Sequence, residues 1–176
     1  MVCESLADNA EWKALPSEQR SALFAAAVMH DTRLDVILMS GLPAAGKDRW
    51  IADHVPEWPV VSSDAIRRQQ NVQPEDDQGS VVAEARRVAR AYLQEARPFV
   101  WNATNVTALA RSRVIGLLQD YRARVRIVYM ETSWEELLRR NRARKTSAPE
   151  AILEKLARKL DVPKVTEAHR VDYHCA

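Results

Sequence analysis

The 176-residue sequence predicts an α/β fold in which a parallel sheet lies between layers of helices. The first observation is that short apolar segments alternate with segments of helical periodicity from residue 35 onward. The second is a glycine-framed loop between the first apolar segment and a following helix. The third is the composition: 47% of the residues are hydrophobic and 28% are charged, which supports a sizeable core and excludes a largely disordered chain.

Four short segments have the length and residue types of buried strands. Each is mainly apolar and ends in polar or turn residues, which is typical of parallel strands covered on both faces. Their predicted ranges are 35–40, 58–62, 98–102 and 125–130. Because ligands bind at the carboxyl ends of the strands in open α/β sheets, the residues that follow these segments are the candidates for function.

The segments between these strands predict helices. Residues 81–96 place their apolar side chains at helical spacing, and Ser133 with Glu136 three residues later forms a capping box. The predicted helices span 48–54, 64–70, 81–96, 108–121, 133–140 and 149–160, and a loop is predicted over 71–80. No pattern assigns the tail from Val162 onward.

Charge, cysteine content and hydropathy exclude several classes of protein. The formal net charge is only +2, which argues against a protein that coats nucleic acid without specificity. Cys3 and Cys175 are the only cysteines, so neither a disulfide framework nor a cysteine metal cluster is available. No apolar segment approaches the roughly 18 residues that a membrane span requires, and the N-terminus lacks the form of a secretion signal. We therefore expect a cytoplasmic protein with no membrane partner.

A phosphate-binding pattern, G-x-x-x-x-G-K, occurs directly after the first predicted strand. It comprises Gly41, Leu42, Pro43, Ala44, Ala45, Gly46 and Lys47, and it is followed by Asp48 and Arg49. The backbone N–H groups of such a loop point inward, the next helix adds its positive N-terminal end, and the lysine reaches the β- and γ-phosphates. We predict that residues 41–49 bind ATP or another nucleoside triphosphate; a strand–turn–helix corner without a ligand is the alternative.

Asp48 departs from this pattern, which has Ser or Thr at that position to bind Mg²⁺. A carboxylate beside a triphosphate is repulsive unless it reaches a cation. Either Asp48 joins the metal shell, directly or through water, or it turns away and the metal is held by water and phosphates. The sequence therefore predicts Mg²⁺ as a cofactor, with Asp48 as its candidate ligand.

Polar residues after the second and third predicted strands are candidates for the acceptor side of a phosphoryl transfer. Asp64 has the chemistry to accept the proton of an attacking hydroxyl, with a helix N-cap as its alternative role. Arg67 follows on the same helical face, and its guanidinium can donate two parallel hydrogen bonds to an acceptor phosphate. Small polar side chains after the third strand predict further hydrogen bonds, and they are Asn102, Thr104 and Asn105.

A basic segment at residues 139–145 has five basic residues in seven. Phosphoryl transfer needs positive charge on the oxygens of the migrating group, often from arginines that arrive when a lid closes. Arg140 and Arg144 are spaced i, i+4 and so lie on one helical face. We predict a helical lid that carries these two arginines; a solvated, charged helix end is the alternative.

With these segments in order, the chain from about residue 35 to residue 173 resembles the kinase module of the P-loop polynucleotide 5′-hydroxyl kinases. The resemblance rests on GLPAAGKDRW, VSSDAIR, WNATN and ETSWEELLRRNRARK. It implies a P-loop kinase-type three-layer sandwich with strand order 2-3-1-4-5, and transfer of the γ-phosphoryl group of ATP to a 5′-OH RNA or DNA end. The residues that it implies carry the reaction are Lys47, Asp64, Arg67, Arg140 and Arg144.

The chain departs from that family at Asp48, where Ser or Thr is usual, and at Ala103, where the family often has Asp. Two other functions therefore stay open: a small-molecule or nucleoside kinase of the same fold, and a nucleotide-binding module without turnover. The sequence carries no signal of oligomeric state.

The chain before the first strand is predicted to form a helical segment over residues 1–31, with the kinase domain over 32–176. Residues 12–31 resemble the opening of an HD phosphohydrolase domain, and His30-Asp31 would be half of its metal motif. A remnant of such a domain and an ordinary amphipathic helix are the two interpretations.

Overall fold

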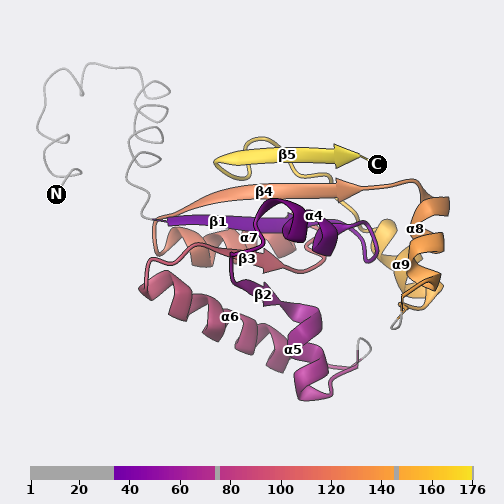
Figure 1. Ribbon diagram of the computed structural model, residues 1–176, viewed down its shortest axis with the longest axis horizontal. Helices are drawn as coiled ribbons and strands as arrows, with labels where there is room; N and C mark the ends of the chain where they lie inside the picture. Colours follow the sequence, from indigo (N-terminus) through magenta and orange to yellow (C-terminus); the bar gives the residue numbers. More distant parts are fainter. Residues whose placement is uncertain (1–33, 74–75, 145–146, 176) are drawn as a thin grey trace, which may run out of the picture. The chain divides into compact units, whose positions relative to one another are not determined.

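The computed structural model describes residues 34–73, 76–144 and 147–175, which contain a five-stranded parallel sheet with helices packed against it (Figure 1). The sheet order is β2-β3-β1-β4-β5, and every neighbouring pair is parallel. Its strands are β1 (Leu34–Ser40), β2 (Val60–Ser62), β3 (Phe99–Asn102), β4 (Ala123–Glu131) and β5 (Arg170–Cys175). The predicted fold class and strand order are confirmed. The helical segment predicted over 1–31, with its HD interpretation, lies outside the described residues, and the domain boundary stays a prediction.

The described helices lie where the periodicity predicted them. They are α4 (Lys47–His54), α5 (Ser63–Gln70), α6 (Gly79–Gln94), α7 (Ala108–Gln119), α8 (Trp134–Arg142) and α9 (Glu150–Ala157). α6 begins two residues earlier than predicted, where an Asp77 carboxylate oxygen accepts the Gly79 N–H at 3.2 Å. α9 ends at Ala157 because the chain then tightens, with the Leu160 N–H donating to the carbonyl of Ala157 only three residues back.

The core is divided by the sheet into two faces, as the two-residue period of a strand requires. Along β1, Val36 and Leu38 pack into the cluster formed with α6 and α7, whereas Ile37 and Met39 pack against α4. All four side chains are almost fully buried, at 3% exposure or less. This double coverage explains why β1 is continuously apolar and holds the loop that follows it in a fixed position.

The tail that no pattern assigned forms β5, which pairs with β4 at the edge of the sheet. Its side chains alternate between half-buried and exposed, and contacts with β4 include a polar pair and an aromatic pair. Asp172 forms an ion pair with Arg126, and the rings of Tyr173 and Tyr129 meet edge to face at 6.2 Å. A polar edge strand of this kind lacks the apolar pattern by which a strand is found in a sequence.

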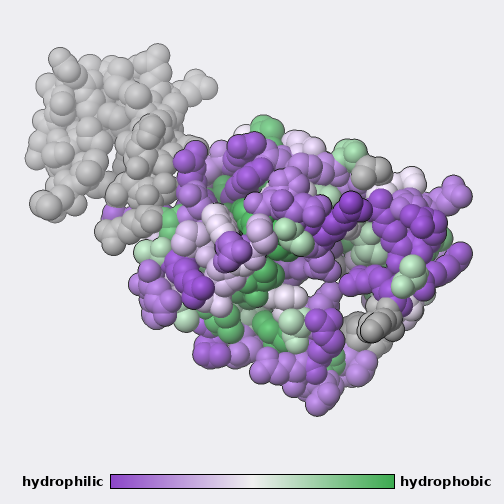
Figure 2. Space-filling view, in the orientation of Figure 1, coloured by the Kyte–Doolittle hydropathy of each residue, from purple (hydrophilic) through white to green (hydrophobic). Residues whose placement is uncertain are grey.

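The surface of the described residues is mostly hydrophilic on the face that Figure 2 presents. The same view shows a hollow between α5 and the α8–α9 pair. Within the described part of the chain, none of the helices is both long enough and apolar enough to cross a membrane.

Candidate active site

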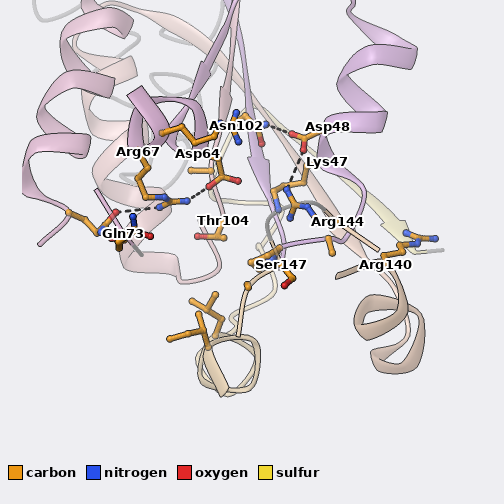
Figure 3. A pocket seen from close by; sticks show the side chains of 18 of the residues that line it. Lys47, Asp48, Asp64, Arg67, Gln73, Asn102, Thr104, Arg140, Arg144 and Ser147 are labelled. Carbon is orange, nitrogen blue, oxygen red and sulfur yellow. Dashed lines mark hydrogen bonds and ion pairs between the residues drawn. The ribbon is translucent and has the colours of Figure 1, made fainter. Parts of the chain in front are cut away.

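A cavity of about 670 Å³ lies at the carboxyl edge of the sheet, between the phosphate loop, α5 and the α8–α9 pair (Figures 2 and 3). The structure brings most of the predicted site residues into its lining. Those that line it are Pro43, Ala44, Gly46, Lys47, Asp48, Arg49, Asp64, Arg67, Asn102, Thr104, Arg140 and Arg144. Residues that are up to about a hundred positions apart in the sequence thus face one cavity.

The phosphate loop depends on glycine at both of its ends. A Cβ atom on Gly41, whose φ is 141°, would lie 2.4 Å from the carbonyl oxygen of Met130 in β4. Gly46 has a φ of 104° and is the N-cap of α4. Both conformations are ones that side-chain-bearing residues rarely adopt, so these glycines bring the backbone close to β4 and turn it into the helix.

Leu42 and Ala45 contribute backbone to this loop but no side chain to the cavity, because both side chains are buried. Leu42 packs with Leu137 of α8 and Leu153 of α9, so the loop and the lid helices share one small apolar cluster. Ala45 packs with the α4 face of the sheet. The Ala45 N–H donates to the carbonyl of Leu42 at 3.2 Å, which closes the turn of the loop.

The ammonium group of Lys47 is held within the loop that it belongs to. Its Nζ donates hydrogen bonds to the carbonyl oxygens of Gly41 at 2.8 Å and Leu42 at 2.7 Å. Burial lowers the pKa of Lys47 to about 8; the nearby Asp48 opposes this and Arg144 adds to it. A bound phosphate would have to replace these two carbonyls, and it would raise the pKa of the lysine again.

Asp48 does not turn away from the cavity. Its Oδ1 accepts a hydrogen bond of 2.7 Å from Nδ2 of Asn102, at the end of β3, and its Oδ2 lies 3.9 Å from Nη2 of Arg144 (Figure 3). The Asp48 side chain is 75% exposed, whereas Asn102 is buried. Arg49, next along α4, is an exposed residue of the rim and pairs with Asp53 at 3.5 Å.

The polar residues after β3 separate into two groups. Thr104 lines the cavity, and its carbonyl oxygen accepts the Gly41 N–H at 2.9 Å. Asn105, predicted as an acceptor contact, does not line the cavity: its side chain is buried and donates to the carbonyl of Met39 at 2.9 Å. The prediction of an acceptor contact by Asn105 is wrong, because its side-chain amide already holds the loop to β1 through this hydrogen bond.

The side chain that faces Asp48 comes from Asn102, at the end of β3. Ala103, where the family often has Asp, also lines the cavity, and its half-buried side chain packs against the core cluster on the α6–α7 face. Neither of these two positions therefore carries an acidic side chain.

Asp64 and Arg67 lie on one face of α5, on the side of the cavity opposite the phosphate loop (Figure 3). Nη2 of Arg67 donates to Oδ1 of Asp64, and Nη1 donates to Oε1 of Gln78 at 3.4 Å. The N-cap of α5 is Ser62, whose side chain accepts the Ala65 N–H at 3.2 Å. Asp64 is therefore not the cap, and its half-exposed carboxylate is available to the cavity.

The predicted lid consists of α8 and α9. Arg140 lies beside the phosphate loop, with its Nη1 3.6 Å from the point where a Cβ on Gly46 would lie, and its Nε donates to Glu136 at 2.5 Å. Hydrogen bonds from Arg139 and then Arg140 lower the pKa of Glu136 to about 2. In Figure 3, Arg144 joins the group around Lys47 and Asp48, while Arg140 lies apart from it.

Sequence reasoning missed part of the cavity wall. On the acceptor side, Gln73 and Gln78 come from the segment before α6, and Ile152 and Leu156 of α9 face the cavity from the lid. The amide of Asn141 in α8 fixes Ala148 by two hydrogen bonds of 2.8 and 3.0 Å, which holds the approach to α9 in place. The helical spacing of Ile152 and Leu156 was a usable signal; the glutamines had none.

Mg²⁺ is compatible with the residues present. Among the described residues, no group of three or more His, Cys, Asp or Glu side chains gathers to hold a metal ion. Mg²⁺ does not need such a cage, because it keeps several waters and uses one or two carboxylates together with substrate phosphates. Asp48 offers one exposed carboxylate next to the phosphate loop, so the donor set fits a nucleotide-bound Mg²⁺.

A phosphate loop after β1 and this strand order define the P-loop kinase fold, and solved structures share it. One chain of the Pnkp1/Rnl/Hen1 RNA repair complex matches with a TM-score of 0.64 and 19% identity, over 72% of this chain and 44% of that chain. A sugar kinase from Janibacter sp. HTCC2649 matches with a TM-score of 0.61 and 13% identity, over 81% and 85%. Mycobacterium tuberculosis APS kinase CysC, in complex with AMPPNP and APS, matches with a TM-score of 0.52 and 17% identity, over 81% and 89%.

The family follows from the sequence match. The AAA_33 model, described as an AAA domain, matches residues 36–163, and the chain belongs to this family. No curated protein matches the chain. The solved structures therefore show the P-loop kinase fold and the sequence match shows the family, whereas neither determines the acceptor of this chain.

Proposed function

We propose that the protein transfers the γ-phosphoryl group of ATP to the 5′-hydroxyl of an RNA or DNA end. The observation that supports this most directly is that Asp64 and Arg67 face the phosphate loop across one cavity, because a general base and a phosphate-binding fork are what such an acceptor requires.

The phosphates of ATP bind to backbone N–H groups of the loop, those of Ala44 and Gly46 among them, and to Lys47 once its Nζ leaves the carbonyls of the loop. Asp48 would hold a nucleotide-bound Mg²⁺, and this ion would supply positive charge to the phosphates when bound. Arg140 and Arg144 balance the charge that spreads over the migrating group. Their place on the lid makes this charge available when the cavity closes over its ligands.

Asp64 accepts the proton of the attacking 5′-hydroxyl as the new bond to the γ-phosphorus forms and the bond to the β–γ bridging oxygen breaks. For this step the Asp64 carboxylate must exchange its contact with Arg67 for the hydroxyl. A 5′-terminal nucleotide offers that exchange, because its next phosphodiester is an anion for Arg67 and the neighbouring Arg68, which also lines the cavity.

A second candidate is a kinase of small polyhydroxy molecules. Gln73 and Gln78 place neutral amides on the acceptor side, and such groups suit hydroxyls better than phosphodiesters. The Gln78 amide is already a partner of Arg67 and of the backbone carbonyls of Gln73 and Asp76, so the Gln73 side chain is the neutral amide that would bind an acceptor hydroxyl. This neutral amide in the cavity wall is the feature that favours an uncharged acceptor.

The two candidates are separated by incubating the protein with γ-labelled ATP, Mg²⁺ and equal concentrations of a 5′-OH oligoribonucleotide, its DNA counterpart, nucleosides and simple sugars. A control oligonucleotide that already carries a 5′-phosphate is included in a parallel reaction. We expect label on the 5′ ends of the 5′-OH oligonucleotides and none on this control. Transfer to a nucleoside or sugar alone would support the second candidate. ATP binding without transfer to any acceptor would leave a nucleotide-binding module.

A further inference from the structure

Asp48 and Asn102 are the two side chains that meet between the phosphate loop and β3. The Asn102 amide donates to the Asp48 carboxylate at 2.7 Å, and both residues line the cavity (Figure 3). Asn102 is 8% exposed and fixed at the end of a buried strand, whereas the Asp48 side chain is 75% exposed. The buried amide therefore orients one oxygen of an otherwise accessible carboxylate.

The chemical types at these two places are the reverse of the usual ones. In P-loop proteins, a hydroxyl follows the loop lysine and a carboxylate comes from a neighbouring strand, and the two together hold Mg²⁺. Here the carboxylate follows Lys47 on α4, and the neutral oxygen-bearing side chain ends β3. The site thus still has one carboxylate and one neutral polar side chain, but the carboxylate lies on the helix and the neutral side chain lies on the strand.

The surroundings of Asp48 indicate what this carboxylate is for. Its ion pair among the described residues is a long one, 3.9 Å to Arg144, and its Oδ2 is free of any hydrogen bond that would fix it. The cavity that it faces is the one whose loop would bind the phosphates of ATP. With no cation between them, the carboxylate and the phosphates repel each other, whereas a divalent cation converts the same carboxylate into an attraction.

We propose that Asp48 supplies the protein carboxylate for the nucleotide-bound Mg²⁺ and that Asn102 is its positioning residue, so that the usual ligand types are exchanged between α4 and β3. The inference rests on the proposed function only in that the cavity binds ATP. It assigns no acceptor, and it holds for a nucleotide-binding module as well as for a kinase.

The proposed exchange predicts that replacing Asp48 has opposite effects on ATP affinity in the absence and in the presence of Mg²⁺. In EDTA, Asp48→Ser removes a repulsion and should tighten ATP binding. In excess Mg²⁺, the same variant has a neutral hydroxyl in place of the carboxylate, leaves the metal without a charged protein ligand, and should bind ATP more weakly than the wild type. The ratio of ATP affinity with Mg²⁺ to that without it should therefore fall by about tenfold or more. Asn102→Ala should lower the same ratio while leaving Asp48 in place.

The decisive variant is the double substitution Asp48→Ser with Asn102→Asp, which returns each chemical type to its usual element. ATP dissociation constants for the full chain are measured by calorimetry in Mg²⁺ and in EDTA, with a thermal melt of each free variant to show that it is folded. We expect the double variant to recover most of the Mg²⁺ dependence that Asp48→Ser loses. Asp53→Ser, an exposed acid on α4 outside the cavity lining, is the matched control and should change neither constant.

The inference is overturned if Asp48→Ser retains the wild-type Mg²⁺ dependence, or if the folded double variant is no better than Asp48→Ser. These outcomes are independent of phosphotransfer. A wild-type chain that binds Mg²⁺-ATP in the predicted way but phosphorylates no acceptor contradicts the proposed function and leaves the exchange intact.

Discussion

The guanidinium of Arg111 and the carboxylate of Glu167 form two hydrogen bonds, of 2.6 and 3.0 Å, across 56 residues of sequence. Arg111 is fully buried, and its Nη1 also donates to the carbonyl of Asp161 at 2.8 Å. The pair therefore holds the segment that precedes β5 against α7.

Glu167→Gln should lower the free energy of unfolding by about 3 kcal/mol, because it leaves a buried guanidinium without its counterion. Urea denaturation measures this. Glu154→Gln, which alters an exposed pair with Arg158 at 3.9 Å, is the control and should leave the free energy of unfolding unchanged within error. Equal stability of the wild type and Glu167→Gln would contradict the role assigned to the pair.

The same pair predicts an acid-sensitive contribution to stability. Burial opposes ionisation of Glu167, but hydrogen bonds from Arg111 and the Lys164 N–H hold its pKa below the ordinary 4.5. A lowered carboxyl pKa stabilises the folded state above the unfolded pKa, and this contribution is lost as the pH falls from about 4.5 through the folded value. The difference in unfolding free energy between the wild type and Glu167→Gln should shrink over that range.

ATP binding should weaken as the pH rises above 8. The pKa of Lys47 is lowered to about 8 by burial, so the lysine loses its charge in the free protein above that pH, while phosphates bind the charged form. The affinity should fall by about fivefold between pH 8 and pH 9, as the charged fraction of the lysine falls. Lys47→Arg should show no such dependence, because guanidinium stays charged. Parallel curves for the two proteins, measured by ATP titration, would contradict the prediction.

Asp64→Asn should reduce the rate of phosphotransfer by about 10²–10⁴-fold and leave ATP affinity unchanged. The reason is that Asp64 lines the acceptor side of the cavity and, within the described part of the chain, its carboxylate pairs with Arg67 rather than with the phosphate loop. The phosphotransfer rate is measured with a 5′-OH oligonucleotide, and the ATP affinity is measured as a dissociation constant. Asp120→Asn, at the exposed end of α7, is the control. Loss of ATP affinity in Asp64→Asn would contradict this assignment.

Arg139 and Arg140 form a matched pair for testing the lid. Both donate to Glu136, but Arg140 lines the cavity and is 34% exposed, whereas Arg139 is 73% exposed and lies outside the lining. Arg140→Ala should lower kcat by about 10³-fold if its guanidinium supports the migrating group. Arg139→Ala should change kcat less than about twofold, because its surface pair contributes little. Similar losses in both variants would assign the effect to Glu136 instead.

Gly41 and Gly116 offer the same substitution in opposite settings. Gly41→Ala places a Cβ 2.4 Å from the Met130 carbonyl at a positive φ, so it should destabilise the fold by about 1–3 kcal/mol and abolish ATP binding. Gly116→Ala, in the middle of α7 with nothing within 4 Å of the new Cβ, should stabilise it by about 0.5–1 kcal/mol. Thermal or urea denaturation of the two variants compares the effects directly.

Most of the fold was predictable because its central strands are buried on both faces. β1 is a near-continuous apolar segment, β4 has an apolar centre, and the predicted cap at Ser133 is the observed start of α8. β5 was not predictable for the opposite reason: it is a half-exposed edge strand held by the Arg126–Asp172 pair and by Tyr173, and these partners lie more than forty residues away in the sequence.

The candidate site was predictable where function is encoded in short spacing. The loop from Gly41 to Lys47 and the i, i+3 pair Asp64 and Arg67 need only local geometry. The roles of Asn102 and Asn105 needed the tertiary structure, because neighbouring residues after a strand point in different directions. One amide faces Asp48, and the other is buried against β1.

The sequence by itself determined the α/β class, the phosphate-loop pattern and the residue types that we propose for phosphoryl transfer, since these depend on periodicity and on chemistry within a few residues. Only the tertiary structure decided which polar groups meet: Asp48 with Asn102, Arg67 with Gln78, and Arg111 with Glu167. Such pairings depend on the register of parallel strands and on how the chain returns to the sheet, and no local pattern carries that information.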